Sequence, residues 1–130
     1  MSKVKIAIDL LNPRGLGEKF KIAFRGILYL FLHHRNMRYI FLIGIAAILL
    51  GFYFKLNGIE LIALSITITL VFVAEILNTA IELMLDAVTK EYNYKIKLIK
   101  DIAAGVVVIT CVNALLIGYV LFIRRFFKQI

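Results

Sequence analysis

The sequence predicts an all-α membrane protein with three transmembrane helices and an N-terminal interfacial amphipathic helix. Two observations support this fold class. The chain of 130 residues is 62% hydrophobic and has a mean hydropathy of +0.94, which is too apolar for an ordinary soluble domain. Its apolar residues also gather in three long runs, as they do in membrane-spanning helices. The length of the chain then predicts a single membrane-embedded domain.

The three apolar runs have lengths close to those of membrane-spanning helices. A hydrocarbon core of ~30 Å requires about 20 helical residues. The run at residues 102–123 has no charge over 22 residues and predicts a span at residues 101–123. The run at residues 59–88 predicts a long second span. The run at residues 39–54 has only 16 residues, and it predicts a first span at residues 39–55 whose flanking side chains extend to the interface.

Residues 16–36, which precede the first span, have the pattern of an amphipathic helix. Phe20, Phe24 and Phe31 recur at helical spacing, while charged side chains lie on the opposite face. We expect this helix to lie in the membrane interface with its phenylalanines at the acyl boundary. A helix that docks on a soluble core is the alternative. Residues 1–15 form an N-terminal segment to which the pattern assigns no role.

The cationic residues predict the orientation in the membrane. Of sixteen Lys and Arg, eight precede residue 39 and four lie at residues 90–100, against one in the first loop and three in the C-terminal tail. With three crossings, the N-terminus and the second loop share one side and carry twelve cations, against four opposite. The positive-inside rule therefore predicts a multi-pass protein with a cytoplasmic N-terminus. These basic residues lie next to membrane spans, so they are expected to contact an anionic lipid surface and not a nucleic acid.

Four polar residues form a stripe in the second apolar run, namely Glu75, Asn78, Glu82 and Asp86. At about 100° per residue they fall within roughly 80° of one helix face. Carboxylates in a membrane are costly, so they should face a bundle interior or the water boundary and have partners. This acidic stripe suits a membrane enzyme that holds a metal ion and a polar substrate. Polar contacts between helices, or an ion path through a small transporter or channel, are the alternatives.

A second group of charges stands where the third span begins. Lys100 and Asp101 are followed at once by Ala103, Ala104 and Gly105. Small residues let a neighbouring helix approach closely, which would bring Lys100 and Asp101 to the acidic stripe. Phosphoryl transfer needs neutralised phosphate charge, a metal ion and a base that orients the attacking hydroxyl. A lysine beside several carboxylates supplies such groups, and the absence of GxxxxGK[ST] excludes a P-loop.

These elements resemble the prokaryotic diacylglycerol kinase family, which includes the undecaprenol kinases. The resemblance extends over about residues 16–125. The Ala-Ala-Gly at residues 103–105 is more similar to the undecaprenol kinase branch of the family. The matching elements are ExLNTAIExxxD at residues 75–86, the pair Glu91-Tyr92 and KDxAAG at residues 100–105.

The resemblance implies a homotrimer of three-span subunits in the inner (cytoplasmic) membrane of a bacterium, which phosphorylates a membrane lipid with ATP and Mg²⁺. Its substrate would be the hydroxyl of undecaprenol or diacylglycerol. Glu75 would be the general base and Glu82 a metal ligand. The residues implied in ATP binding are Asn78, Asp86, Lys100 and Asp101.

One position departs from the family pattern. The family usually has a metal-binding glutamate where this chain has His34, which precedes Glu75 by forty-one residues as in the family. An imidazole is a poorer ligand for Mg²⁺ than a carboxylate. With His34 in place of the glutamate as the candidate metal ligand, three outcomes are open: the metal is held by Glu82 and the phosphates alone, the site takes Mn²⁺ or Zn²⁺, or activity is low. A kinase-like scaffold disabled at His34 is the non-catalytic alternative.

Three further residues receive structural interpretations. Cys111, the single cysteine, is expected to be a packing residue in the third span. Asn113 is expected to form a hydrogen bond between helices. Glu60, in the first loop region, is expected to be a solvated charge.

Overall fold

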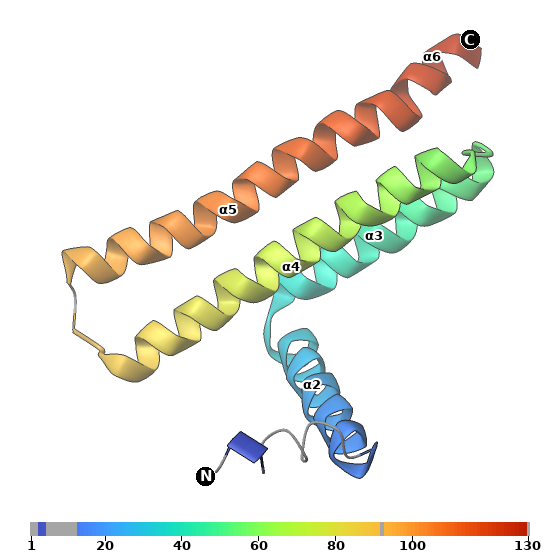
Figure 1. Cartoon of the computed structure of the whole chain (residues 1–130). Helices are drawn as coiled ribbons and strands as arrows, with labels where there is room; N and C mark the ends of the chain where they lie inside the picture. Colours follow the sequence, from blue (N-terminus) through green and yellow to red (C-terminus); the bar gives the residue numbers. More distant parts are fainter. Residues whose placement is uncertain (1–2, 5–12, 92, 130) are drawn as a thin grey trace. The chain divides into compact units, whose positions relative to one another are not determined.

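The computed structural model describes residues 3–4, 13–91 and 93–129. It divides into two compact units, Met1–Arg35 and Asn36–Ile130, and its described elements are helices (Figure 1). Most of the predicted N-terminal segment lies outside the described residues, as does Tyr92. Each unit is therefore considered by itself.

Three helices of the described chain are long and apolar enough to cross a membrane. They are Arg35–Tyr53, Gly58–Val88 and Tyr94–Lys128. The prediction of an all-α protein with three candidate transmembrane helices is thereby confirmed.

The first unit contains helix α2 (Pro13–His33), in the region where an amphipathic helix was predicted. Its Phe20 and Phe24 are exposed, as expected for side chains that would enter an acyl boundary. Near the end of α2, the rings of Tyr29 and His33 stack with centroids 4.2 Å apart. The interfacial position of α2 stays a prediction.

The second unit is built from three long helical segments. Helices α3 (Arg35–Tyr53) and α4 (Gly58–Val88) are joined by a short turn. The third segment consists of α5 (Tyr94–Gly118), the π-helical turn η1 (Tyr119–Ile123) and α6 (Arg124–Gln129). The central helix α4 packs against both α3 and α5 (Figure 1).

Glycines allow α3 to approach α4 closely. A Cβ at Gly44 would lie 3.1 Å from the Cγ2 atom of Ile68, and a Cβ at Gly51 would lie 3.3 Å from a Cδ atom of Leu64. In a membrane the hydrophobic effect does not drive helices together, so their packing depends on close approach of the backbones. The two glycines therefore set the distance between the first two spans.

The turn after α3 closes with a left-handed residue. Lys55 has φ 55°. The backbone N–H of Leu56 donates to the carbonyl of Gly51 at 3.0 Å, and the backbone N–H of Lys55 donates to the carbonyl of Phe52 at 3.2 Å. These are the two hydrogen bonds of a Schellman motif, which satisfies the last carbonyls of a helix. Asn57 then caps the start of α4. The turn thus reverses the chain within four residues and orients α4 antiparallel to α3.

The last turns of the third segment contact the start of α4. The Arg125 guanidinium donates to both carboxylate oxygens of Glu60, at 2.5 and 2.6 Å, and to the carbonyl of Phe54 at 3.2 Å. The π-helical turn η1 carries an extra residue and so shifts the face on which the following side chains project. The prediction that Glu60 is a solvated charge is wrong, because Arg125 of the third segment forms an ion pair with it.

Candidate active site

The acidic stripe lies along one face of the second half of α4, and its exposure rises toward the end of the helix. Glu75 is buried, with 6% of its surface exposed. Asn78 and Glu82 are half-buried, and Asp86 is exposed. At 1.5 Å per residue the stripe spans ~16 Å. It therefore connects a buried carboxylate to the end of the bundle.

Glu75 is a buried residue whose carboxylate makes no hydrogen bond within the described residues. Within the described part of the chain, the hydrogen bond at this residue runs from the Thr79 hydroxyl to the Glu75 backbone carbonyl, at 2.9 Å. The Thr79 hydroxyl hydrogen is thus used by the backbone. A buried carboxylate that has no donor is costly. The arrangement calls for a donor from a ligand or from another chain.

Asn78 presents a second unsatisfied acceptor on the same face. Its side-chain oxygen Oδ1 is fully buried and, among the described residues, has no hydrogen-bond partner. Buried polar atoms in folded proteins are normally paired, so an orphan calls for an explanation such as a ligand or water. Asn78 lies three residues after Glu75, and the two side chains therefore offer adjacent acceptors to one polar group.

The start of α5 reaches the acidic stripe through Lys100. The Lys100 ammonium lies 2.9 Å from the Asp86 carboxylate, with side chains 38% and 64% exposed. Ala103, one turn later, is buried, as close helix packing requires. Asp101 instead pairs with Lys97 within α5 at 3.0 Å. The structure thus brings Lys100 to the stripe and holds Asp101 on its own helix.

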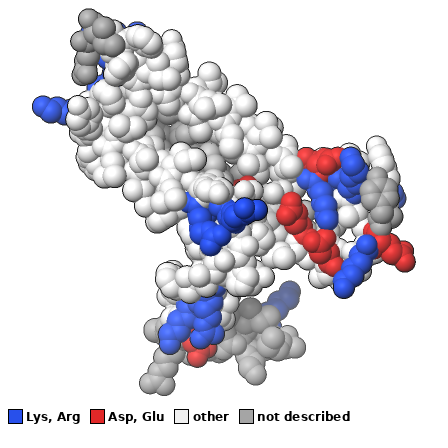
Figure 2. Space-filling view, turned by 180° about the vertical axis from the view of Figure 1, so that it is seen from behind, with Lys and Arg blue, Asp and Glu red and all other residues white. Residues whose placement is uncertain are grey.

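The charged side chains are concentrated at one end of the second unit. Figure 2 shows acidic and basic side chains gathered over the connection between α4 and α5, while most of the bundle surface between its ends is uncharged. Exposed ion pairs such as Lys100–Asp86 contribute little to stability. Their groups can therefore exchange partners with an incoming phosphate at low cost.

His34 and Glu82, the residues predicted to hold a metal ion, belong to different units. His34 follows α2 and is half-buried, and its backbone N–H donates to the backbone carbonyl of Leu30 at 2.9 Å. No three His, Cys, Asp or Glu side chains of the described residues gather as a ligand set. Magnesium is usually bound through one or two carboxylates together with substrate phosphates. The half-buried Glu82 carboxylate fits that mode, and the pairing with His34 stays a prediction.

Two features of this region were not found from the sequence. Thr79 stands four residues after Glu75, so its spacing could have indicated contact with that turn of α4. The burial of the Asn78 oxygen could not be predicted from the sequence, because the burial of one atom depends on how the helices pack against each other.

Comparison with known proteins identifies the family of this chain. The model of the prokaryotic diacylglycerol kinase family matches residues 21–122. The chain belongs to the prokaryotic diacylglycerol kinase family. The matched region includes the whole acidic stripe and Lys100, so the resemblance stated from the sequence is confirmed.

Two relatives in this family carry different names. The chain is 35% identical over 100 residues to a diacylglycerol kinase of Synechocystis sp., an overlap of 76% of this chain and 57% of that protein. It is 33% identical over 108 residues to the undecaprenol kinase of Bacillus subtilis, an overlap of 83% of this chain and 88% of that protein. The chain thus spans little more than half the length of the Synechocystis relative. The relatives agree on lipid phosphorylation and differ in the lipid.

Proposed function

We propose that this chain is a lipid kinase that transfers the γ-phosphate of ATP to the hydroxyl of a membrane lipid at the cytoplasmic interface. The observation that carries the proposal is the buried residue Glu75, whose carboxylate has no hydrogen bond among the described residues, beside the unpartnered oxygen of Asn78. A lipid hydroxyl has one O–H donor, which would satisfy the Glu75 carboxylate. Family membership supplies the reaction class.

Glu75 acts as the general base in this proposal. As the lipid oxygen attacks the γ-phosphorus, the hydroxyl O–H bond breaks and its proton passes to Glu75. A new O–P bond forms while the bond to the β-phosphate oxygen breaks, and ADP leaves. A base within hydrogen-bond reach of the hydroxyl typically contributes 10²–10⁴-fold.

The groups that hold ATP lie toward the exposed end of the acidic stripe. Lys100 exchanges Asp86 for a phosphate, since its present ion pair is exposed. Asn78, Asp86 and Asp101 complete the nucleotide contacts. Magnesium, when bound with the phosphates, supplies neutralisation of their charge. Glu82 would hold it together with the phosphates.

The length of α4 supports a site at the interface. Its 31 residues extend over ~46 Å, whereas the hydrocarbon core is ~30 Å thick. If the core begins at the short turn before α4, Glu82 and Asp86 lie beyond it and Glu75 lies close to its far boundary. A transporter would instead place its carboxylates near the midplane. The cation distribution supports a cytoplasmic location for this boundary.

We further propose that the active form is a homotrimer. Glu75 and Asn78 lack partners within the described chain, and exposed apolar side chains cover all three spans. Neighbouring subunits and the substrate together would satisfy these acceptors. Cross-linking in detergent should give a closed homo-oligomer, and a homogeneous, fully active monomer would contradict this part of the proposal.

The test is transfer of radiolabelled phosphate from ATP to undecaprenol and to diacylglycerol in mixed micelles. Glu75→Gln should lower turnover at least about 100-fold, because the amide cannot accept the proton. Binding of ATP should persist, since Glu75 contacts the lipid. Glu18→Gln, an exposed glutamate on α2, is the matched control and should retain turnover.

Near-normal turnover by Glu75→Gln would remove Glu75 as the base. Failure of the wild type to phosphorylate either lipid, while it binds ATP, would point to the kinase-like scaffold instead.

A further inference from the structure

Two exposed polar side chains lie in the middle of membrane spans, Thr69 on α4 and Asn113 on α5. Thr69 follows the first residue of α4, Gly58, by eleven residues, and Asn113 precedes Arg124 by eleven residues. At 1.5 Å per residue, each lies about 16 Å from the end of the bundle that holds the turn between α3 and α4. This is about half the ~30 Å thickness of the hydrocarbon core. Both side chains are too short to reach water from there.

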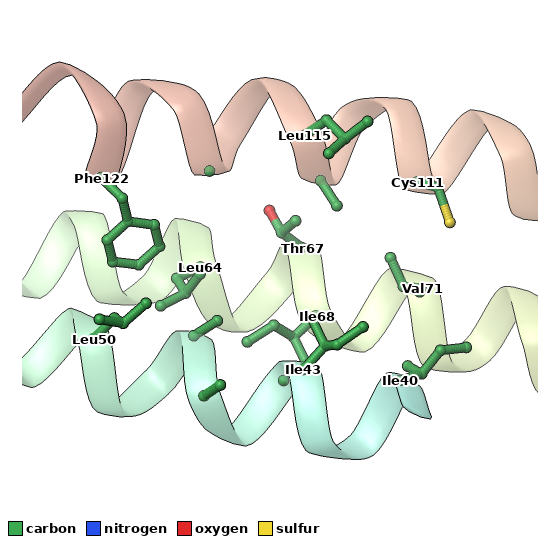
Figure 3. Close-up of a pocket in the computed structure, with 15 residues that line it drawn as sticks. Ile40, Ile43, Leu50, Leu64, Thr67, Ile68, Val71, Cys111, Leu115 and Phe122 are labelled. Atoms are coloured by element: carbon green, nitrogen blue, oxygen red, sulfur yellow. The ribbon is translucent and has the colours of Figure 1, made fainter. Parts of the chain in front are cut away.

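The two residues lie at the same depth. Two pairs of residues that line the apolar groove between α3, α4 and α5 mark the depth, because the members of each pair lie level with each other in Figure 3: Thr67 with Leu115, and Val71 with Cys111. Thr69 and Asn113 each stand midway in the sequence between the two markers on their own helix. Since α4 and α5 run in opposite directions (Figure 1), Thr69 and Asn113 are level as well.

Both side chains lie on the side of their helix that is turned away from the groove. Each is two residues from both markers on its helix, and two residues of an α-helix correspond to a rotation of about 200°. Ser65, one turn before Thr69, is also small and exposed. The surface of α4 and α5 opposite the groove therefore carries polar groups at mid-depth that the rest of the bundle does not cover.

The Thr69 hydroxyl differs from those of three other threonines in the spans. Thr67, Thr79 and Thr110 each donate to a backbone carbonyl of their own helix, at 2.7, 2.9 and 2.8 Å. By contrast, the side chains of Thr69 and Asn113 form no hydrogen bond with any described residue. A polar group without a partner is costly in hydrocarbon. These two groups therefore call for partners from another chain.

We infer that Asn113 of one copy forms a hydrogen bond with Thr69 of a second copy, so that α5 of each chain packs against α4 of the next. The amide and the hydroxyl each donate and accept, and each therefore satisfies the other. A contact between different surfaces of identical chains is heterologous, and such contacts generate closed rings. The inference names a contact surface for the proposed homotrimer and rests on that oligomer, not on phosphate transfer.

A contact of Asn113 with the same residue of the second copy is the alternative. It would leave the Thr69 hydroxyl in hydrocarbon without a partner at the same depth. Contacts between membrane helices favour small residues four apart, which let backbones approach closely, and Ser65 and Thr69 have this spacing. The bulky, exposed Ile109 and Leu116 flank Asn113 and suit such a surface. The pair of Asn113 with Thr69 therefore satisfies both polar groups and matches large side chains with small ones.

The first experiment tests proximity by disulfide formation between two differently tagged full-length copies in membranes. Cys111 is replaced by alanine in both copies, and one copy then carries Thr69→Cys and the other Asn113→Cys. A disulfide requires Cβ atoms about 3.5–4.5 Å apart. The control pairs Thr69→Cys with Val112→Cys, which is exposed and lies about 100° around α5 from Asn113. A mixed disulfide is expected with Asn113→Cys and not with the control.

The second experiment measures association of the full-length chain in lipid bilayers by energy transfer between labelled copies. Thr69→Val and Asn113→Leu should each weaken association about 3–30-fold, the range for a hydrogen bond between membrane helices. The double variant should associate no more weakly than either single variant, because each substitution removes the same hydrogen bond. Thr69→Ser keeps the hydroxyl and should associate like the wild type.

The outcomes separate this contact from the proposed kinase. Disulfides of Asn113→Cys with itself alone, or additive effects of the two substitutions, would overturn the pair. Oligomers that neither cross-link nor weaken would overturn it too. A chain that phosphorylates lipids as a monomer would refute the contact and the homotrimer but not the kinase. Mixed disulfides in a chain that transfers no phosphate would support the contact and refute the kinase.

Discussion

The ion pair between Arg125 and Glu60 should stabilise the fold more than the other described ion pairs. Its side chains are 35% and 20% exposed, whereas those of Lys97 and Asp101 are 56% and 61% exposed. The guanidinium also makes two hydrogen bonds to the carboxylate and one to the carbonyl of Phe54. Both hydrogen bonds to the carboxylate come from one nitrogen, Nη2, and charge-assisted, partly desolvated pairs of this kind are stronger than exposed ones.

The magnitude follows from this intermediate exposure. Fully exposed ion pairs contribute ~0–1 kcal/mol, and removal of one partner from a buried pair costs ~3–5 kcal/mol. Arg125→Met should therefore lower the free energy of unfolding by about 2 kcal/mol, between these limits. The loss includes the hydrogen bond to Phe54, which joins the third segment to the turn before α4.

The assay is a double-mutant cycle with Arg125→Met and Glu60→Gln, in which the free energy of unfolding is measured in detergent micelles. The coupling energy should be about 1–2 kcal/mol. A matched cycle with Lys97→Met and Asp101→Asn should give ~0.3–0.5 kcal/mol, as helical i,i+4 pairs do. A coupling for Arg125 and Glu60 no larger than that of the control would refute the reasoning.

Three other substitutions test separate features. His34→Glu should raise turnover with Mg²⁺ or lower the Mg²⁺ concentration required, because it restores a hard oxygen ligand; identical metal profiles for the wild type, His34→Glu and His34→Ala would show that this position does not touch the metal. Lys55→Gly should raise the free energy of unfolding by ~1 kcal/mol, since φ 55° is costly for a residue with a Cβ; a destabilised variant would contradict this. Gly44→Val should lower that free energy by ~1–3 kcal/mol through overpacking against Ile68, and Gly26→Val, whose Cβ meets nothing within 4 Å, is its control.

The fold class could be predicted from the sequence because it depends on properties that single segments carry. A long apolar run needs a membrane, whatever it packs against, and its length sets the number of crossings. The acidic stripe could also be predicted, because its four residues are spaced so that an α-helix places them on one face. Lys100 could be assigned to the stripe because the small residues after it permit close packing.

The sequence by itself determined the three candidate spans, the face that carries Glu75 and the family to which the chain belongs. Only the tertiary structure decided that Arg125 pairs with Glu60 across 65 residues, that the oxygen of Asn78 is buried without a partner among the described residues, and that an apolar groove lies between α3, α4 and α5. The physical reason is that periodicity acts within one helix, whereas burial, pairing and empty volume arise from the register of several helices packed together.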